Sequence, residues 1–182
     1  MRKIQNIFFL LLLITFGCNS KQSNTTDYSF ANVKTELIKG RVNDYGNILT
    51  EPEESTLNEL LKSLEDSIGS QLVILTIDSL YGETIESYSL KVADKKIGRA
   101  SHNDGILILV SVKDRKVRIE VGYGLELIIK DEIAWRIINQ QITPEFKKGN
   151  FFEGLNKGSE EIIQLIYSNP ELVGKEWESQ KK

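Results

Sequence analysis

Acidic and amide side chains flank one apolar run and the segment that follows it. Asn103 and Asp104 directly precede the run GILILV, and Glu120 lies near the end of the alternating segment VRIEV. The short turn KDRK joins the two segments, which favours an antiparallel hairpin. Because one hairpin strand begins beside the place where the other ends, we expect these side chains to gather at one end of a sheet.

Two glycines follow at the same expected end of the sheet. Gly122 and Gly124 enclose Tyr123, and Glu126 comes two residues later. Such a turn can present backbone N–H groups to a phosphate. A bare phosphate would meet the nearby carboxylates, and each like-charge pair costs about 1 kcal/mol even in water. A divalent cation reverses this, because Ca²⁺ and Mg²⁺ prefer carboxylate and carbonyl oxygens.

The pattern therefore predicts a Ca²⁺ or Mg²⁺ site at this end of the hairpin. Its predicted ligands are Asn103, Asp104, Glu120 and Glu126, and the residues that shape its loop are Gly105, Gly122, Tyr123 and Gly124. A bound cation would polarise a phosphoryl group, which gives the first functional hypothesis, a metal-dependent phosphomonoesterase. His102 is the candidate general acid, and no catalytic nucleophile is evident.

Each of these residues also has an ordinary structural explanation. Asn103 and Asp104 could form a turn, Glu120 could face solvent, and Glu126 could favour the dipole of the next helix. Gly122 and Gly124 could be present only because the backbone there adopts angles that other residues disfavour. Tyr123 could contact a ligand or partner or simply pack, and Arg99 could meet a phosphate or, like His102, be a solvated loop residue. Trp135 and Trp177 should pack or fray.

The N-terminal residues predict export and lipid attachment. Arg2 and Lys3 precede an apolar run over 7–16, which is too short to span a bilayer because a spanning helix needs about 20 residues. The sequence ITFGC resembles a bacterial lipobox, so we expect residues 1–17 to be a signal peptide and Cys18 to carry lipid. Residues 18–39 are the predicted tether. The protein should then be anchored in the cell envelope on the extracytoplasmic side, in contact with the membrane.

Composition excludes several classes of function. Removing Arg2 and Lys3 with the signal peptide changes the formal net charge from −3 to −5, which disfavours nucleic acid as a partner. Cys18 is the only cysteine, so disulfides and thiolate chemistry are excluded from the mature domain. One histidine is too few for a His-rich zinc site.

Hydrophobic periodicity predicts an α/β fold. Helices are expected over 50–69, 84–98, 131–142 and 150–167, and strands over 71–78, 105–112 and 117–121. The first two of these strands are apolar throughout and should be parallel, whereas the third returns as a hairpin. We expect a three-layer α/β/α sandwich with a small mixed sheet, mostly parallel at its core. Residues 168–182 are a polar tail, which should fray after Pro170.

Three local features refine this prediction. Thr50 and Glu53 form a capping-box pattern at the start of the first helix. The third helix should end before Pro144. Gly154 and Gly158, one helical turn apart, suggest that the last helix packs closely on the sheet. Asp78 ends a strand at the opposite end of the sheet from Asp104, so it is left out of the metal site.

The order of these segments resembles the TPM domain family over residues 40–167. The resemblance lies in VNDYGNIL, NDGILILVSVKDRKVRIEVGYGLE and GNFFEGLNKG. It implies an α/β/α sandwich outside the cytoplasm, acid-phosphatase-like activity and divalent-metal binding. Asp44 matches the acidic residue of the family's N-terminal motif and joins the predicted metal ligands. The lipid on Cys18 would replace the C-terminal membrane helix that many members carry.

The resemblance also implies a second hypothesis of another class. Some family members support the maintenance of membrane protein complexes. A tethered domain without a nucleophile could therefore be a binding or assembly module that docks on envelope membrane proteins. The two hypotheses differ in whether phosphate esters are hydrolysed.

Overall fold

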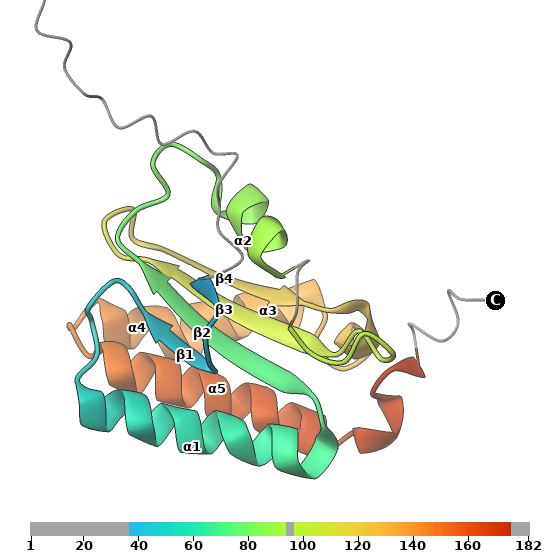
Figure 1. The fold of residues 1–182 in the computed structure, drawn as a ribbon. Helices are drawn as coiled ribbons and strands as arrows, with labels where there is room; N and C mark the ends of the chain where they lie inside the picture. Colours follow the sequence, from blue (N-terminus) through green and yellow to red (C-terminus); the bar gives the residue numbers. More distant parts are fainter. Residues whose placement is uncertain (1–36, 94–96, 176–182) are drawn as a thin grey trace, which may run out of the picture. The chain divides into compact units, whose positions relative to one another are not determined.

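Four strands form one sheet in the order β1-β2-β3-β4 (Figure 1). The computed structural model describes residues 37–93 and 97–175. The strands are β1 (Val42–Asp44), β2 (Gln71–Ile77), β3 (Gly105–Ser111) and β4 (Lys116–Val121). β1, β2 and β3 are parallel, and β4 is antiparallel to β3. The sheet thus has an amino end, where β2 and β3 begin and β4 finishes, and a carboxyl end, where β1, β2 and β3 finish.

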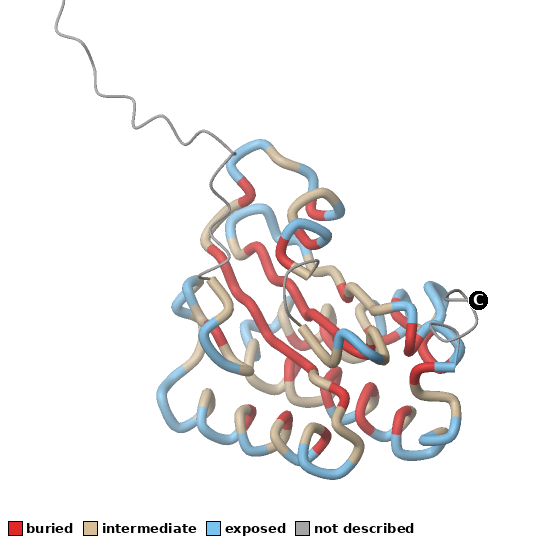
Figure 2. Tube along the Cα trace, turned by 45° about the vertical axis from the view of Figure 1, so that its right-hand side comes forward, coloured by how far each residue is buried: buried red, intermediate tan, exposed pale blue. Residues whose placement is uncertain are grey.

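Helices cover both faces of this sheet, because its central strands are apolar on both sides. Ile106 and Ile108 pack on the side of α1 (Glu51–Ile68) and α5 (Phe151–Tyr167), whereas Leu107 and Leu109 pack on the side of α2 (Ile85–Ala93). Figure 1 shows α1 and α5 below the sheet and α2 above it, and Figure 2 shows the buried strands between them. The predicted three-layer α/β/α sandwich with a mixed sheet is confirmed.

The ends of α1 follow the sequence signals. Glu53 accepts a hydrogen bond from the Thr50 backbone N–H at 2.7 Å, as a capping box requires. The helix stops at Gly69, whose φ of +87° lies in the left-handed region. This stop turns the chain directly into β2.

The helical segment after β4 is longer than predicted. It follows a short 3₁₀ turn, η3 (Tyr123–Leu125), and consists of α3 (Asp131–Ile137), the π-helical η4 (Ile138–Ile142) and α4 (Thr143–Phe146). The prediction that the helix ends before Pro144 is wrong. The wide π turn lies directly before Pro144, so the chain stays helical although proline cannot donate the usual backbone hydrogen bond.

The paired glycines of α5 pack against this helical segment. A Cβ on Gly154 would lie 2.8 Å from the Phe146 ring, and one on Gly158 would lie 2.7 Å from the Ile142 side chain. Close packing was predicted correctly, but the partner is another helix and not the sheet. The glycines therefore fix where α4 lies.

The described chain extends beyond the predicted domain bounds. Ile38 packs against the cluster on the α2 side, so the last residues of the predicted tether belong to the domain. The prediction that the tail frays after Pro170 is wrong for 171–175. There, η5 (Pro170–Leu172) and Val173 pack on the core, and the Gly174 N–H donates to the Gly124 carbonyl at 2.8 Å.

Several sequence predictions lie outside the described residues. The signal peptide, Cys18, most of the tether and Trp177 fall in 1–36 or 176–182. Among the helices of 37–93 and 97–175, none has the length and apolar character needed to cross a bilayer.

Candidate functional site

Asp104 is fully buried at the amino end of the sheet and forms an ion pair with Arg99. Its Oδ2 accepts hydrogen bonds from Arg99 Nε at 2.8 Å and from the Ser70 hydroxyl at 3.1 Å. Its Oδ1 accepts the Arg99 backbone N–H at 2.7 Å. Breaking a buried pair of this kind is costly, so a metal ion would have to displace the guanidinium. Asp104 therefore serves to hold the 99–104 loop.

The glycine turn lies against this loop, as the hairpin argument predicted. The Gly122 N–H donates to the Gly105 carbonyl at 2.9 Å, and the Gly124 N–H donates to the Asn103 carbonyl at 2.8 Å. A Cβ on Gly124 would lie only 1.9 Å from the His102 carbonyl oxygen. The glycines are there because two backbone segments touch, and the N–H groups that a phosphate would need are already used.

Glu120 is bonded away from Asp104, and Glu126 lies at the surface. The Glu120 carboxylate accepts hydrogen bonds from the Ser89 hydroxyl at 2.8 Å and from Arg118 Nε at 2.7 Å. Glu126 is exposed, immediately after η3. Both residues border a shallow pocket of about 350 Å³ between β4 and the start of α3.

Asp44 lies at the opposite end of the sheet from Asp104, so the expectation that it joins the metal site is wrong. Asp44 pairs with Thr76 in β2, and Thr76 pairs with Val110 in β3. Asp104 precedes Val110 by six positions, or roughly 20 Å along a strand. The Asp44 carboxylate bonds the Thr76 hydroxyl and caps the following loop through the Ile48 N–H at 2.9 Å.

The predicted metal cage is therefore not assembled. Asp44 is at the carboxyl end, Asp104 is bound to Arg99, and Glu120 is bound to α2. Within 37–93 and 97–175, no group of three or more His, Cys, Asp or Glu side chains is placed to hold a metal ion. The residues present do not fit a Ca²⁺ or Mg²⁺ ion in the predicted position.

The other residues near the amino end have structural contacts or face outward. His102 Nδ1 is hydrogen-bonded to the Ser101 hydroxyl at 2.8 Å, and its ring lies against Gly174. Tyr123 and Trp135 are 49% and 64% exposed. Among the described residues, no carboxylate is hydrogen-bonded to the His102 ring.

The carboxyl end of the sheet holds further acids, and these are engaged as well. Asp114 accepts hydrogen bonds from the Ser111 hydroxyl at 2.5 Å and from the Leu80 N–H at 2.7 Å, and these bonds lower its pKa. Asp78 pairs with Lys113 at 2.6 Å, which raises the pKa of that lysine. Asp78 thus lies at the end of the sheet where it was predicted.

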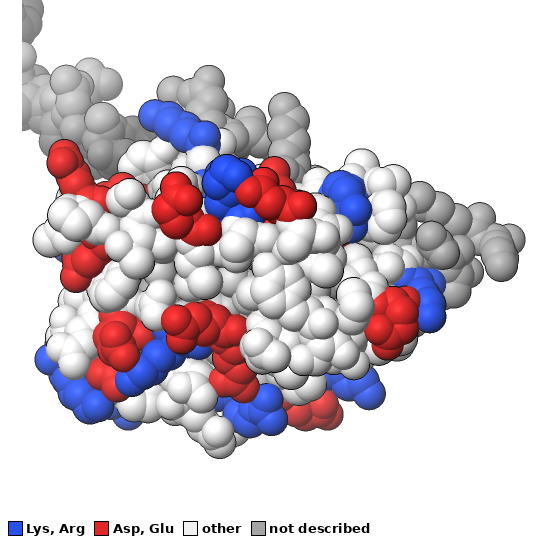
Figure 3. Space-filling view, turned by 90° about the horizontal axis from the view of Figure 1, so that it is seen from below, with Lys and Arg blue, Asp and Glu red and all other residues white. Residues whose placement is uncertain are grey.

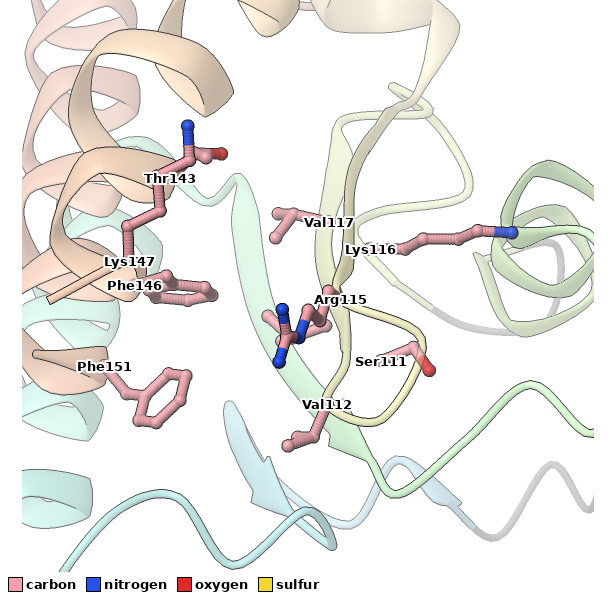
Figure 4. Close-up of a pocket in the computed structure, with 10 residues that line it drawn as sticks. Ser111, Val112, Arg115, Lys116, Val117, Thr143, Phe146, Lys147 and Phe151 are labelled. Carbon is pink, nitrogen blue, oxygen red and sulfur yellow. The ribbon is translucent and has the colours of Figure 1, made fainter. Parts of the chain in front are cut away.

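One charged residue at this end has no such partner. Arg115 closes the hairpin turn Val112–Arg115 with a φ of +52°, a region that non-glycine residues seldom adopt. Its guanidinium makes no hydrogen bond or ion pair with any residue of the described chain. Figure 4 shows it pointing into a pocket of about 470 Å³, between the Phe146 and Phe151 rings on one side and Val112 on the other.

The walls of this Arg115 pocket are apolar and its charged residues are basic. Phe146 and Phe151 meet edge to face, with ring centroids 5.1 Å apart. Lys116 and Lys147 border the pocket, and no lining residue is acidic. Figure 4 shows the Lys116 side chain extending away from the two rings. Arg115 is therefore the cation placed between the apolar walls.

A carboxylate outside the pocket fixes the helical wall. Glu145 in α4 accepts hydrogen bonds from Lys157 at 3.0 Å, Asn150 at 3.1 Å and Lys148 at 3.2 Å. These bonds, with that from Lys157 the strongest influence, lower the pKa of Glu145 to about 2. They join α4 to the start of α5 and so hold Phe146 close to Phe151.

The face formed by α1 and α5 has no dominant charge. Figure 3 views the molecule from that side and shows acidic and basic side chains intermixed among uncharged ones. This face therefore offers no continuous basic patch.

The sheet, its glycine turn and the hairpin all fall within one match to a known family. The model of the TPM domain matches residues 42–165. The chain belongs to the TPM domain family. The TPM domain of this chain includes both ends of the sheet and every residue that lines the Arg115 pocket.

Two solved structures resemble this TPM domain. The N-terminal domain of a P. gingivalis protein, solved by NMR, is 29% identical, with a TM-score of 0.68 over 75% of this chain and 88% of that one. The BA42 protein from the psychrophilic bacterium Bizionia argentinensis is 23% identical, with a TM-score of 0.53 over 66% of this chain and 82% of that one, and it shows the fold alone. No curated protein matches the chain.

Sequence reasoning missed the Arg115 pocket. It treated KDRK only as a turn. The available signal was the absence of glycine or asparagine at the end of a tight four-residue turn, where one of them is usual. Phe146 and Phe151 gave no signal, because their approach to the turn depends on the π-helical segment.

Proposed function

We propose that this TPM domain is a non-catalytic binding module of the bacterial envelope, tethered by lipid on Cys18, that docks on other proteins. The observation that carries the proposal is the Arg115 guanidinium, which points into an apolar pocket and has no partner among residues 37–93 and 97–175. The acids that would serve a metal-dependent phosphatase are instead bonded within the domain or separated from one another.

The chemistry of the pocket suits binding more than turnover. A guanidinium between aromatic rings and valines favours an anionic group attached to an apolar body. General base or nucleophilic catalysis would need a carboxylate, histidine or thiol beside the ligand. Among the residues that line the pocket, none is Asp, Glu, His or Cys.

The cellular setting supports the same function. A lipobox cysteine and a polar tether would keep the domain at an extracytoplasmic membrane surface, where membrane proteins are its neighbours. The link of some TPM proteins to membrane protein complexes agrees with this role.

Phenyl phosphate separates the binding hypothesis from the phosphatase hypothesis, because it is both an apolar anion and a generic phosphatase substrate. The full chain in detergent is titrated with phenyl phosphate in Ca²⁺, in Mg²⁺ and in chelator. We expect saturable NMR shifts at Val112 and Val117, with no release of phenol under any condition.

Two variants serve as matched tests. Arg115→Ala should abolish the saturable shifts, whereas Lys113→Ala, which removes an equal charge from the same hairpin turn outside the pocket lining, should retain them. Phenol release that requires Ca²⁺ or Mg²⁺ would overturn the proposal in favour of the phosphatase. Absence of any saturable shift would overturn the assignment of the pocket.

A further inference from the structure

β4 is an edge strand whose outer side no other strand of the described chain covers. The Gly122 N–H donates to the Gly105 carbonyl, so the alternation of an antiparallel ladder assigns Lys116, Arg118 and Glu120 to bonds with β3. The backbone groups of Val117, Ile119 and Val121 then point outward. Such a row of groups is a template for an added strand.

Two hollows lie along consecutive residues of this strand. The Arg115 pocket takes in Arg115 to Val117 and is closed by α4 and the start of α5. The second pocket, of about 350 Å³, takes in Arg118 to Val121 and is closed by 129–134. An extended segment beside β4 would therefore place its alternate side chains against both hollows.

The charges of the two hollows are opposite. The Arg115 pocket contains no acid, and Lys116 and Lys147 add two further cations at its rim. The second pocket is bordered by four acids and two bases; the acids are Glu120, Glu126, Asp131 and Glu132. The outer side of β4 thus carries basic residues where the strand begins and a surplus of acidic residues where it finishes.

This polarity selects both the partner and its direction. Resting on the proposed binding function, we propose that β4 binds the C-terminal segment of a partner polypeptide as a fifth, antiparallel strand. The terminal carboxylate receives a bidentate hydrogen bond from Arg115. The last side chain, an apolar one, lies against the Phe146 and Phe151 rings. A basic residue about five positions earlier lies opposite the acids, since β4 is six residues long.

The antiparallel direction follows from where the charges lie. A carboxylate can meet Arg115 at the beginning of β4 only if the added strand runs from the finish of β4 toward its beginning. The reverse direction would bring a carboxylate to the acidic hollow, where like charges repel. Antiparallel pairing is also slightly more stable per residue than parallel pairing.

The experiment uses the synthetic peptide Lys-Thr-Val-Thr-Val-Phe with a free C-terminal carboxylate, and the full chain in detergent. We expect binding that weakens by at least about tenfold when the peptide is amidated or when Arg115 is changed to Ala, because a charge-assisted hydrogen bond is lost. Lys113→Ala should change the affinity by less than about twofold, since this exposed charge of the same hairpin turn lies outside the pocket lining and contributes little.

Amide hydrogen exchange provides the structural readout. On peptide binding, protection should increase at Val117, Ile119 and Val121 and stay unchanged at Arg118 and Glu120, which already bond β3. Equal binding of the amidated peptide, or no added protection, would overturn the inference. So would pairing of two copies of this chain through β4 in place of the peptide. If phenyl phosphate still binds when the peptide fails, the proposed function stands and only this inference is lost; if neither binds, both are lost.

Discussion

The two ends of the sheet use charged residues in opposite ways. At the amino end, Asp104 is buried against Arg99 and the glycine turn packs on the loop between them. At the carboxyl end, the hairpin turn is held in a conformation unusual for its last residue, and Arg115 has no partner within the described chain. At the amino end the buried carboxylate stabilises the fold, whereas at the carboxyl end the Arg115 guanidinium is available to a ligand.

The difference shows that residue type and spacing do not distinguish a structural group from a functional one. Asp104, with its glycines nearby, was the stronger candidate by sequence, yet all its hydrogen bonds are internal. Arg115 was not a candidate by sequence, yet its guanidinium points into a pocket. In open α/β sheets ligands usually bind beyond the carboxyl ends of the strands, which agrees with the position of the Arg115 pocket.

The largest effect is expected from Asp104→Ala. It leaves Arg99 and Ser70 without their buried acceptor and should reduce the free energy of unfolding by about 3 kcal/mol. Urea denaturation measures it. Asp78→Ala is the matched control, because it removes an exposed acid of an ion pair at the carboxyl end and should cost less than about 1 kcal/mol. Equal losses for both variants would remove the contrast between the two ends.

Gly124→Ala should have the next largest effect. Its Cβ would lie 1.9 Å from the His102 carbonyl oxygen, so one of the two backbone segments must move. We expect a loss of about 2 kcal/mol in unfolding free energy. Gly40→Ala is the control, because its Cβ would meet only the Val42 carbonyl at 3.9 Å. A stable Gly124→Ala protein would mean that the glycine is not needed for this contact.

Acid should loosen the wall of the Arg115 pocket through Glu145. The pKa of Glu145 is lowered from 4.5 to about 2, so its contribution to stability is present above pH 4.5 and is lost as pH falls toward 2. Thermal melting between pH 5 and pH 2 should show a shallower decline for Glu145→Gln than for the unaltered chain. Parallel declines would mean that the three hydrogen bonds to Glu145 do not couple to folding.

The smallest stability effect is expected from Arg115→Asn, although its effect on binding is large. Asparagine tolerates the left-handed region better than arginine, so unfolding free energy should rise by up to about 0.5 kcal/mol. Phenyl phosphate binding should be lost at the same time. A variant that becomes clearly less stable would show that Arg115 supports the fold, contrary to the comparison of the two ends.

Most of the fold follows from local sequence signals. The capping residues Thr50 and Glu53, the stop at Gly69 and the alternation of β4 each predicted an element that is present. The prediction that the helix ends before Pro144 failed, because hydrophobic periodicity does not indicate the π-helical turn that precedes the proline. The prediction of a frayed tail after Pro170 failed, because Leu172 and Val173 are too few apolar residues to predict its packing.

The site was predicted only in part. The prediction that Asp104 lies near the glycine turn is correct, because it depends only on the antiparallel pairing of the two hairpin strands. Asp44 was placed at the wrong end, because its place rested on the family motif alone and a strand of three residues is too short to show a period. The Asp104–Arg99 pair depends on the bend of the 99–104 loop, with Asn103 at a φ of +49°, which no sequence pattern specified.

The hydrogen bond from Gly174 to Gly124 shows that the folded domain extends beyond the residues that match the family model. The family match stops at residue 165, yet the chain returns eight to nine residues later to cover the turn beside His102. A chain shortened to the matched length would leave the Gly124 carbonyl without this donor and uncover the apolar residues beneath Leu172 and Val173. Domain borders drawn from shared sequence would therefore yield a weakened, aggregation-prone product here, and expression should extend at least through residue 175.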